Sequence, residues 1–98
     1  MGPYTVHLEK HLVYCGSESI SLTVKEYDLL LYLAANRGHV LKRGDILDAV
    51  WGYTFYGSDR VVDDTIRRLR KKLPGIEIST LYGLGYCLTE ERHESLCD

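Results

Sequence analysis

The stretch from Arg60 to Leu73 has the residue spacing of a helix with one buried side. Its apolar residues follow one another at intervals of four, three and four positions: Val62, Ile66, Leu69 and Leu73. On a helix of about 100° per residue, this spacing places them in one stripe that faces a core. The predicted outward face holds Arg60, Val61, Asp64, Thr65, Arg67, Arg68 and Lys71, with Asp63 and Arg70 on its flanks.

Positive charge is concentrated on this predicted helix. Six basic and two acidic residues lie between positions 60 and 72, a local balance of +4 in a chain whose formal net charge is −2. One interpretation is a solvated face with i,i+4 pairs from Asp63 to Arg67 and from Asp64 to Arg68, each worth about 0.2–0.5 kcal/mol. The other interpretation is a contact surface for an anionic partner.

Length and composition exclude several classes of protein. The 98 residues have the size of one small domain with a single core. No apolar run approaches the roughly 20 residues that span a bilayer, and the start of the chain lacks a targeting pattern. We therefore expect a cytoplasmic location and no membrane partner. The three cysteines and four histidines have no metal-ligand or nucleophile spacing, so we expect no disulfide, metal, cofactor or enzymatic activity.

Short alternating segments precede the first predicted helix. We expect an antiparallel sheet from residues 4–8, 11–15 and 20–22. Thr23 and Glu26 have the spacing of a capping box, in which each side chain accepts a hydrogen bond from the other residue's amide. A helix should therefore begin there. Its predicted apolar face holds Tyr27, Leu30, Leu31, Leu33 and Ala34, with Leu29 at the margin.

A second helix and an aromatic loop lead to the basic helix. The connector Val40-Leu41 is predicted to be extended, and residues 43–51 have helical spacing. The N-cap of this second helix falls near Lys42, a residue type that caps poorly. A Gly-bounded aromatic loop follows, and then either Ser58 or Asp59 caps the basic helix.

The basic helix is followed by a hairpin signal. Residues 76–81 and 86–88 are rich in strand-forming residues and are joined through two glycines. Residues 89–98 form a polar, acidic tail. We therefore predict a single α+β domain over residues 1–98, with its core at about residues 4–88. It has a short N-terminal antiparallel sheet, three helices and a C-terminal β-hairpin.

Two helices joined by a loop, the second basic and followed directly by a hairpin, describe a winged helix-turn-helix. Three segments carry a closer resemblance: LTVKEYDLLLYLAANRGHVLKRGDILDAVWG, DRVVDDTIRRLRKKL and ISTLYGLGY. In order and spacing they are similar to the C-terminal DNA-binding effector domain of OmpR/PhoB-type response regulators. The resemblance implies sequence-specific binding of double-stranded DNA by a two-component transcriptional regulator. We expect two copies of the domain on direct-repeat half-sites, because one small recognition helix reads too few base pairs for specificity in a genome.

The resemblance assigns roles to individual residues. The helix of residues 60–73 would enter the major groove with four side chains toward base edges: Val61, Asp64, Thr65 and Arg68. Arg68 is the first candidate, because an arginine can donate two hydrogen bonds to guanine. Asp64 either accepts from a cytosine amino group or orients Arg68. Phosphate contacts would come from Trp51, Arg60, Arg67, Arg70, Lys71, Thr80 and Tyr86. For Trp51, a role as a core residue has at least equal weight, and the two roles are compatible because an indole can bury its body and present its N–H.

The predicted hairpin departs from the family pattern. Tyr82 stands at its tip, where many members place an arginine, and Cys87 stands where the pattern closes with another. Insertion of an arginine into a narrow minor groove is therefore not expected. Tyr82 would instead stack on a sugar or pack on a neighbouring protomer. We also expect no receiver domain within these 98 residues, which fits either an excised effector domain or an orphan.

A second hypothesis is a protein-interaction module that docks through the aromatic loop, residues 51–57. Its candidate contacts are Tyr53, Thr54, Phe55 and Tyr56. In the family the corresponding loop is linked to contact with RNA polymerase. This contact is therefore either a second function of a DNA-binding domain or the main function of the chain.

Overall fold

Three short strands open the fold. The computed structural model describes residues 4–7 and 12–89, so the predicted polar tail lies outside the described residues from position 90 onward. An antiparallel sheet with the order β1-β2-β3 is formed by β1 (Tyr4–His7), β2 (Leu12–Cys15) and β3 (Glu18–Ser21). The expected sheet is confirmed. β3 begins two residues earlier than predicted, because Gly16 (φ 62°) and Ser17 alone make the turn.

The first helix, α1 (Val24–Ala35), begins at the predicted capping box. The Glu26 amide donates to Thr23 Oγ1 at 3.2 Å, and the Thr23 amide donates to Glu26 Oε1 at 2.9 Å. Glu26 is buried and also accepts from Lys72 Nζ at 2.6 Å. Burial acts to raise the pKa of Glu26, but the hydrogen bonds from Lys72 and the Thr23 amide outweigh it, so the pKa lies below its ordinary value.

The buried face of α1 differs from the prediction at three positions. Leu29, which was expected at the margin, is fully buried, whereas Leu31 and Ala34 are only partly buried. Both α2 and α3 pack on α1, so two neighbours rather than one decide which arc of the helix is covered. The periodicity of one helix indicates that a buried face exists, but its partners determine the edges of that face.

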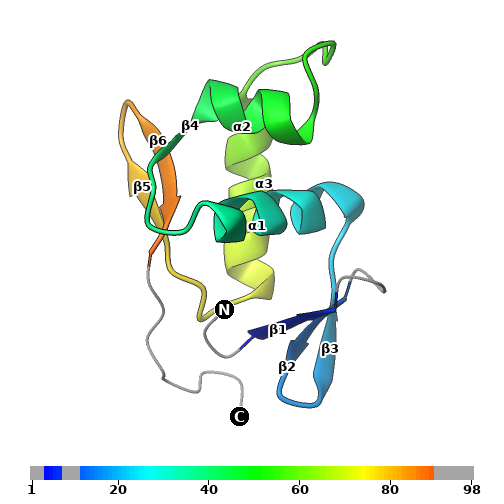
Figure 1. Ribbon diagram of the computed structural model, residues 1–98. Coiled ribbons are helices and arrows are strands. Elements are labelled where there is room, and N and C mark those ends of the chain that lie inside the picture. The colour runs from blue at the N-terminus through cyan, green and yellow to red at the C-terminus, as the bar shows by residue number, and fades with distance from the viewer. Residues whose placement is uncertain (1–3, 8–11, 90–98) are drawn as a thin grey trace.

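The second and third helices lie where the sequence predicts them. α2 (Arg43–Val50) starts after Lys42, which provides no side-chain cap. α3 (Arg60–Lys72) is the predicted basic helix. The Arg60 amide donates to Ser58 Oγ at 3.0 Å, and Asp59 makes no side-chain cap, so Ser58 supports the start of α3. In Figure 1 α1 crosses in front of α3, and the face of α3 opposite to α1 points away from the viewer.

A second three-stranded sheet has the order β4-β6-β5. Its strands are β4 (Leu41–Lys42), β5 (Ile78–Leu81) and β6 (Gly85–Leu88). The hairpin of β5 and β6, here called the wing, is closed by a three-residue turn. In this turn the Leu84 amide donates to the Leu81 carbonyl at 2.9 Å and Gly83 adopts a φ of 80°. The connector before α2 was predicted to be extended, but its pairing with β6 was not predicted.

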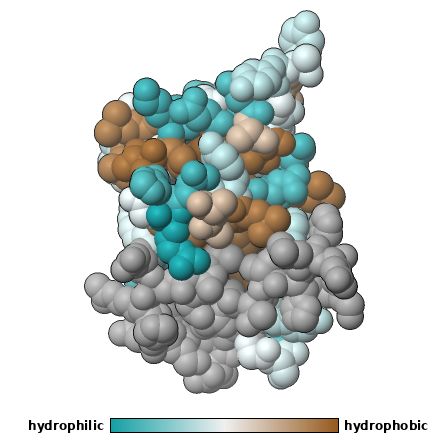
Figure 2. All heavy atoms as spheres, in the orientation of Figure 1, coloured by the Kyte–Doolittle hydropathy of each residue, from teal (hydrophilic) through white to brown (hydrophobic). Residues whose placement is uncertain are grey.

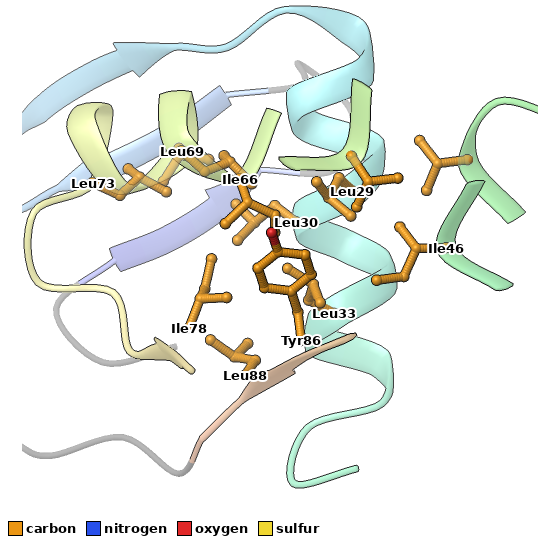
Figure 3. Packing of buried hydrophobic residues seen from close by; sticks show 13 residues of the cluster. Leu29, Leu30, Leu33, Ile46, Ile66, Leu69, Leu73, Ile78, Tyr86 and Leu88 are labelled. Atoms are coloured by element: carbon orange, nitrogen blue, oxygen red, sulfur yellow. The ribbon is translucent and has the colours of Figure 1, made fainter. Parts of the chain in front are cut away.

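One hydrophobic core joins all three helices to both sheets (Figure 3). Its buried members are Val13, Leu29, Leu30, Leu33, Ile46, Val50, Val62, Ile66, Leu69, Leu73, Ile78, Tyr86 and Leu88. The four predicted stripe residues are all among them. At roughly 1.5–3 kcal/mol for each fully buried aliphatic side chain, this stripe holds α3 on the core. The expected α+β winged helix-turn-helix is confirmed. None of its described helices is long and apolar enough to cross a membrane.

Candidate nucleic-acid interface

The outward face of α3 carries exposed positive charge. Its exposed cations are Arg60, Arg67, Arg68 and Lys71. The predicted i,i+4 pairs do not form among the described residues. Instead Arg67 Nη2 lies 3.8 Å from Asp64 Oδ1 at i,i+3, and the Arg67 side chain is 75% exposed. A solvent-exposed pair at this distance contributes little, so the cationic face is available to an anionic partner. Val61 is half-buried at the edge of the same face.

Thr65 does not lie on the outward face. Its side chain is 3% exposed, and its hydroxyl donates to the Val61 carbonyl at 2.7 Å. At about 100° per residue, Thr65 lies only about 70° from the centre of the apolar stripe of α3. A small side chain at that angle is covered by its neighbours. The prediction that Thr65 faces base edges is therefore wrong for this structure.

Arg70 lies at a similar angle on the other side of the stripe and turns toward the wing. Its Nη2 atom donates to Thr80 Oγ1 at 2.8 Å and to the carbonyl of Ile78. The guanidinium carbon also lies 5.9 Å from the centre of the Tyr86 ring. Arg70 thus fastens α3 to β5 and β6. It does not stand on the outward face as a predicted phosphate contact would, and Thr80 is half-buried beside it.

Tyr86 was also predicted to contact phosphate, but it is 7% exposed and belongs to the core. Its hydroxyl donates to Asp63 Oδ1 at 2.5 Å. Burial raises the pKa of Tyr86 to about 12, and the hydrogen bond to the Asp63 carboxylate acts in the same direction. The hydroxyl therefore stays protonated at neutral pH and its proton is already donated. The structure corrects the predicted role of Tyr86 from a phosphate contact to a link between β6 and α3.

Arg43 was not predicted to belong to the site, yet it contacts the start of α3. Its Nη2 atom lies 3.0 Å from Asp59 Oδ1 and 2.7 Å from Asp63 Oδ2. Asp63 therefore pairs with a residue 20 positions away, not with Arg67 one turn further along α3. Helical spacing signals only contacts within one helix. Nothing in the sequence pattern signals a contact between these two elements.

An open groove of about 500 Å³ separates the wing from the N-terminal ends of α2 and α3. Residues that line it include Lys42, Arg43, Asp59, Asp63, Tyr82 and Tyr86. Tyr82 at the wing tip is 94% exposed, and Leu84 is 58% exposed. Positions 78–88 hold no lysine or arginine, so the tip offers apolar and hydroxyl contacts. Figure 2 shows apolar residues at the upper left of the molecule, over the wing and β4.

The aromatic loop between α2 and α3 has an inner and an outer part. Trp51 is half-buried against the core, and its ring lies 6.4 Å from the ring of Phe55 at a tilt of 54°. The predicted core role of Trp51 is thus present. Tyr53 and Tyr56 are 89% and 99% exposed, and Thr54 between them is exposed as well. The loop therefore presents two tyrosines beyond an aromatic pair that holds its base.

The sequence matches one family of regulators. Residues 16–88 match the family described as "Transcriptional regulatory protein, C terminal". The transcriptional regulatory protein CssR of Bacillus subtilis is 54% identical over 67 residues, which are 68% of this chain and 30% of CssR. The sensory transduction protein RegX3 of Mycobacterium tuberculosis is 39% identical over 92 residues, which are 89% of this chain and 40% of RegX3. The chain thus spans well under half the length of these relatives.

Solved structures agree with this match. The DNA-binding domain of Bacillus subtilis CssR has a TM-score of 0.83 and 46% identity, covering 87% of this chain and 98% of that domain. The RstA DNA-binding domain of Klebsiella pneumoniae, solved in complex with the RstA box, has a TM-score of 0.79 and 33% identity. The match covers 90% of this chain and 92% of the RstA domain. This chain therefore belongs to the family of C-terminal effector domains of OmpR/PhoB-type transcriptional regulatory proteins.

Proposed function

We propose that this chain binds double-stranded DNA sequence-specifically, as the effector domain of a two-component-type transcriptional regulator. The single observation that carries the proposal is the outward face of α3, where cations are exposed while the opposite stripe is fully buried. A major groove admits an α-helix, and exposed arginines can bind both phosphates and guanine edges. The related RstA domain, which was solved with the RstA box, supports the same use of the fold. Since the DNA lies in the cytoplasm, the proposal includes that location.

The structure narrows the set of proposed contacts. Base edges would be read by Val61, Asp64 and Arg68, which lie on or at the edge of the outward face of α3. Phosphates would be bound by Arg60, Arg67 and Lys71, with Trp51 and Thr80 as further candidates at the margins of this face. The Thr80 hydroxyl accepts from Arg70 but keeps its own proton to donate. Thr65, Arg70 and Tyr86 leave the set, because their polar groups are engaged within the domain. Tyr82 would contact a sugar or a neighbouring protomer.

Selection from a random duplex library tests this function directly. One recognition helix reads too few base pairs for specificity in a genome. We therefore expect this chain, at fixed salt, to enrich a short site repeated at about 10–10.5 base pairs, bound by two copies side by side. Enrichment of a single unrepeated site would contradict the tandem arrangement. General binding that falls with salt but selects no sequence would contradict specific recognition.

We further propose that the aromatic loop contacts RNA polymerase. Support comes from Tyr53 and Tyr56, which are almost fully exposed although aromatic side chains favour burial at interfaces. The double variant Tyr53→Ala/Tyr56→Ala should bind the selected duplex within about twofold of wild type, yet lose activation at a promoter that carries the site. The matched control Phe55→Ala removes a ring packed on Trp51 and should affect both readouts. Equal loss of DNA binding in the double variant would make the loop structural.

A further inference from the structure

We infer that Arg43 is a positioning residue for DNA binding, which partly offsets the charge of two carboxylates at the start of α3 without touching DNA itself. The inference rests on the proposed DNA-binding function. Arg43 is the first residue of α2, and one of its nitrogens reaches both Asp59 and Asp63. Asp59 immediately precedes α3, and Asp63 lies in its first turn. A single guanidinium from α2 thus holds both acidic groups at that end of α3.

The same carboxylate links a third element to this point. Asp63 uses Oδ2 for Arg43 and Oδ1 for the Tyr86 hydroxyl. Tyr86 lies on β6, whose partner strand β4 leads directly into Arg43. α2, α3 and the wing therefore meet at one carboxylate.

The charges explain why this contact matters for an anionic ligand. The N-terminal end of a helix attracts anions, because its unpaired amides and its dipole are positive there. Asp59 and Asp63 occupy that end of α3, and their side chains are 45% and 40% exposed. Without Arg43 they would repel a DNA phosphate that approaches between α3 and the wing. Arg43, whose side chain is 37% exposed, cancels part of this repulsion while it is itself turned toward the carboxylates.

A set of charge variants separates positioning from direct contact. Arg43→Gln should weaken binding of the selected duplex about 5- to 10-fold, because two carboxylates lose their counter-charge. The slope of log affinity against log salt should stay within about half a unit of wild type, since no phosphate contact is lost. Arg67→Ala serves as the reference for a phosphate contact and should flatten the same slope by about one unit. A slope change of that size in Arg43→Gln would overturn the inference.

Charge restoration provides the second arm of the test. The triple variant Arg43→Gln/Asp59→Asn/Asp63→Asn should recover most of the lost affinity, whereas a merely structural role for Arg43 predicts no recovery. Asp59→Asn alone keeps Arg43 and should strengthen binding about twofold, which keeps the inference testable if Arg43→Gln does not fold. An unchanged or weaker affinity of Asp59→Asn would contradict it. If the wild-type chain itself selects no duplex, the proposed function is refuted. The inference about Arg43 fails separately, when the wild-type chain selects a duplex but the variants do not change its affinity as described.

Discussion

Gly85→Ala is expected to destabilise the domain by about 3 kcal/mol or more, which is large for a single methyl group. A Cβ at Gly85 would lie 1.9 Å from the carbonyl oxygen of Leu41 and 2.8 Å from its carbonyl carbon. Both are backbone atoms of β4, so no rotamer change can relieve the contact. Gly85 pairs directly with Lys42, and the two strands would have to separate. The wing would then lose its attachment to the start of α2.

Urea denaturation of the two variants Gly85→Ala and Gly44→Ala measures this effect. Gly44 is the matched control, because it lies in α2 and a methyl group added there would meet no atom within 4 Å. Its replacement should stabilise the domain by about 0.5–1 kcal/mol, since alanine loses less backbone entropy than glycine. Wild-type stability in Gly85→Ala would mean that β4 and β6 do not pair as described. Arg43 follows β4 directly, so a shift of β4 would also move Arg43. We therefore expect Gly85→Ala to weaken duplex binding as well.

Features that depend on near neighbours in the chain could be predicted from the sequence. The capping box of Thr23 and Glu26 is a contact over three residues, and both of its hydrogen bonds are present. The buried stripe of α3 follows from a periodicity that only a helix satisfies. These local signals, together with the hairpin signal at the end of the chain, were sufficient to predict the α+β winged helix-turn-helix fold.

Features that depend on distant residues could not be predicted. One interpretation of the sequence paired Asp63 with Arg67, one turn away, but Arg43 and Tyr86 reach it from other elements. A half-buried ion pair between two elements stabilises a fold more than an exposed pair within one helix does. In the sequence, Gly85 indicated only a turn. In the structure, the absence of a side chain at Gly85 allows the backbone of β4 to pack closely against it. The site was therefore predictable as a cationic helix face, but the residues that hold this face in place were not.

Arg68→Ala is expected to weaken binding to the selected site about 10- to 100-fold and to relax the preference for one base pair within it, since a bidentate arginine contributes about 1–3 kcal/mol of discrimination. Arg68 is exposed on α3, one turn after Asp64 and two turns after Val61. It forms no ion pair with any residue in the described part of the chain. The variant therefore removes an exposed guanidinium, the group for which we propose the base contact.

Arg67→Ala is the matched control for this second prediction, because it removes the same side chain from the adjacent position of α3. It should weaken binding to all duplexes alike, without changing the preferred sequence. Competition by duplexes with single base-pair changes, at one salt concentration, measures both variants on the same scale. The decisive comparison is the affinity ratio between the selected duplex and each changed duplex. If this ratio is the same in Arg68→Ala and in wild type, Arg68 binds phosphate, and base reading falls to Val61 and Asp64.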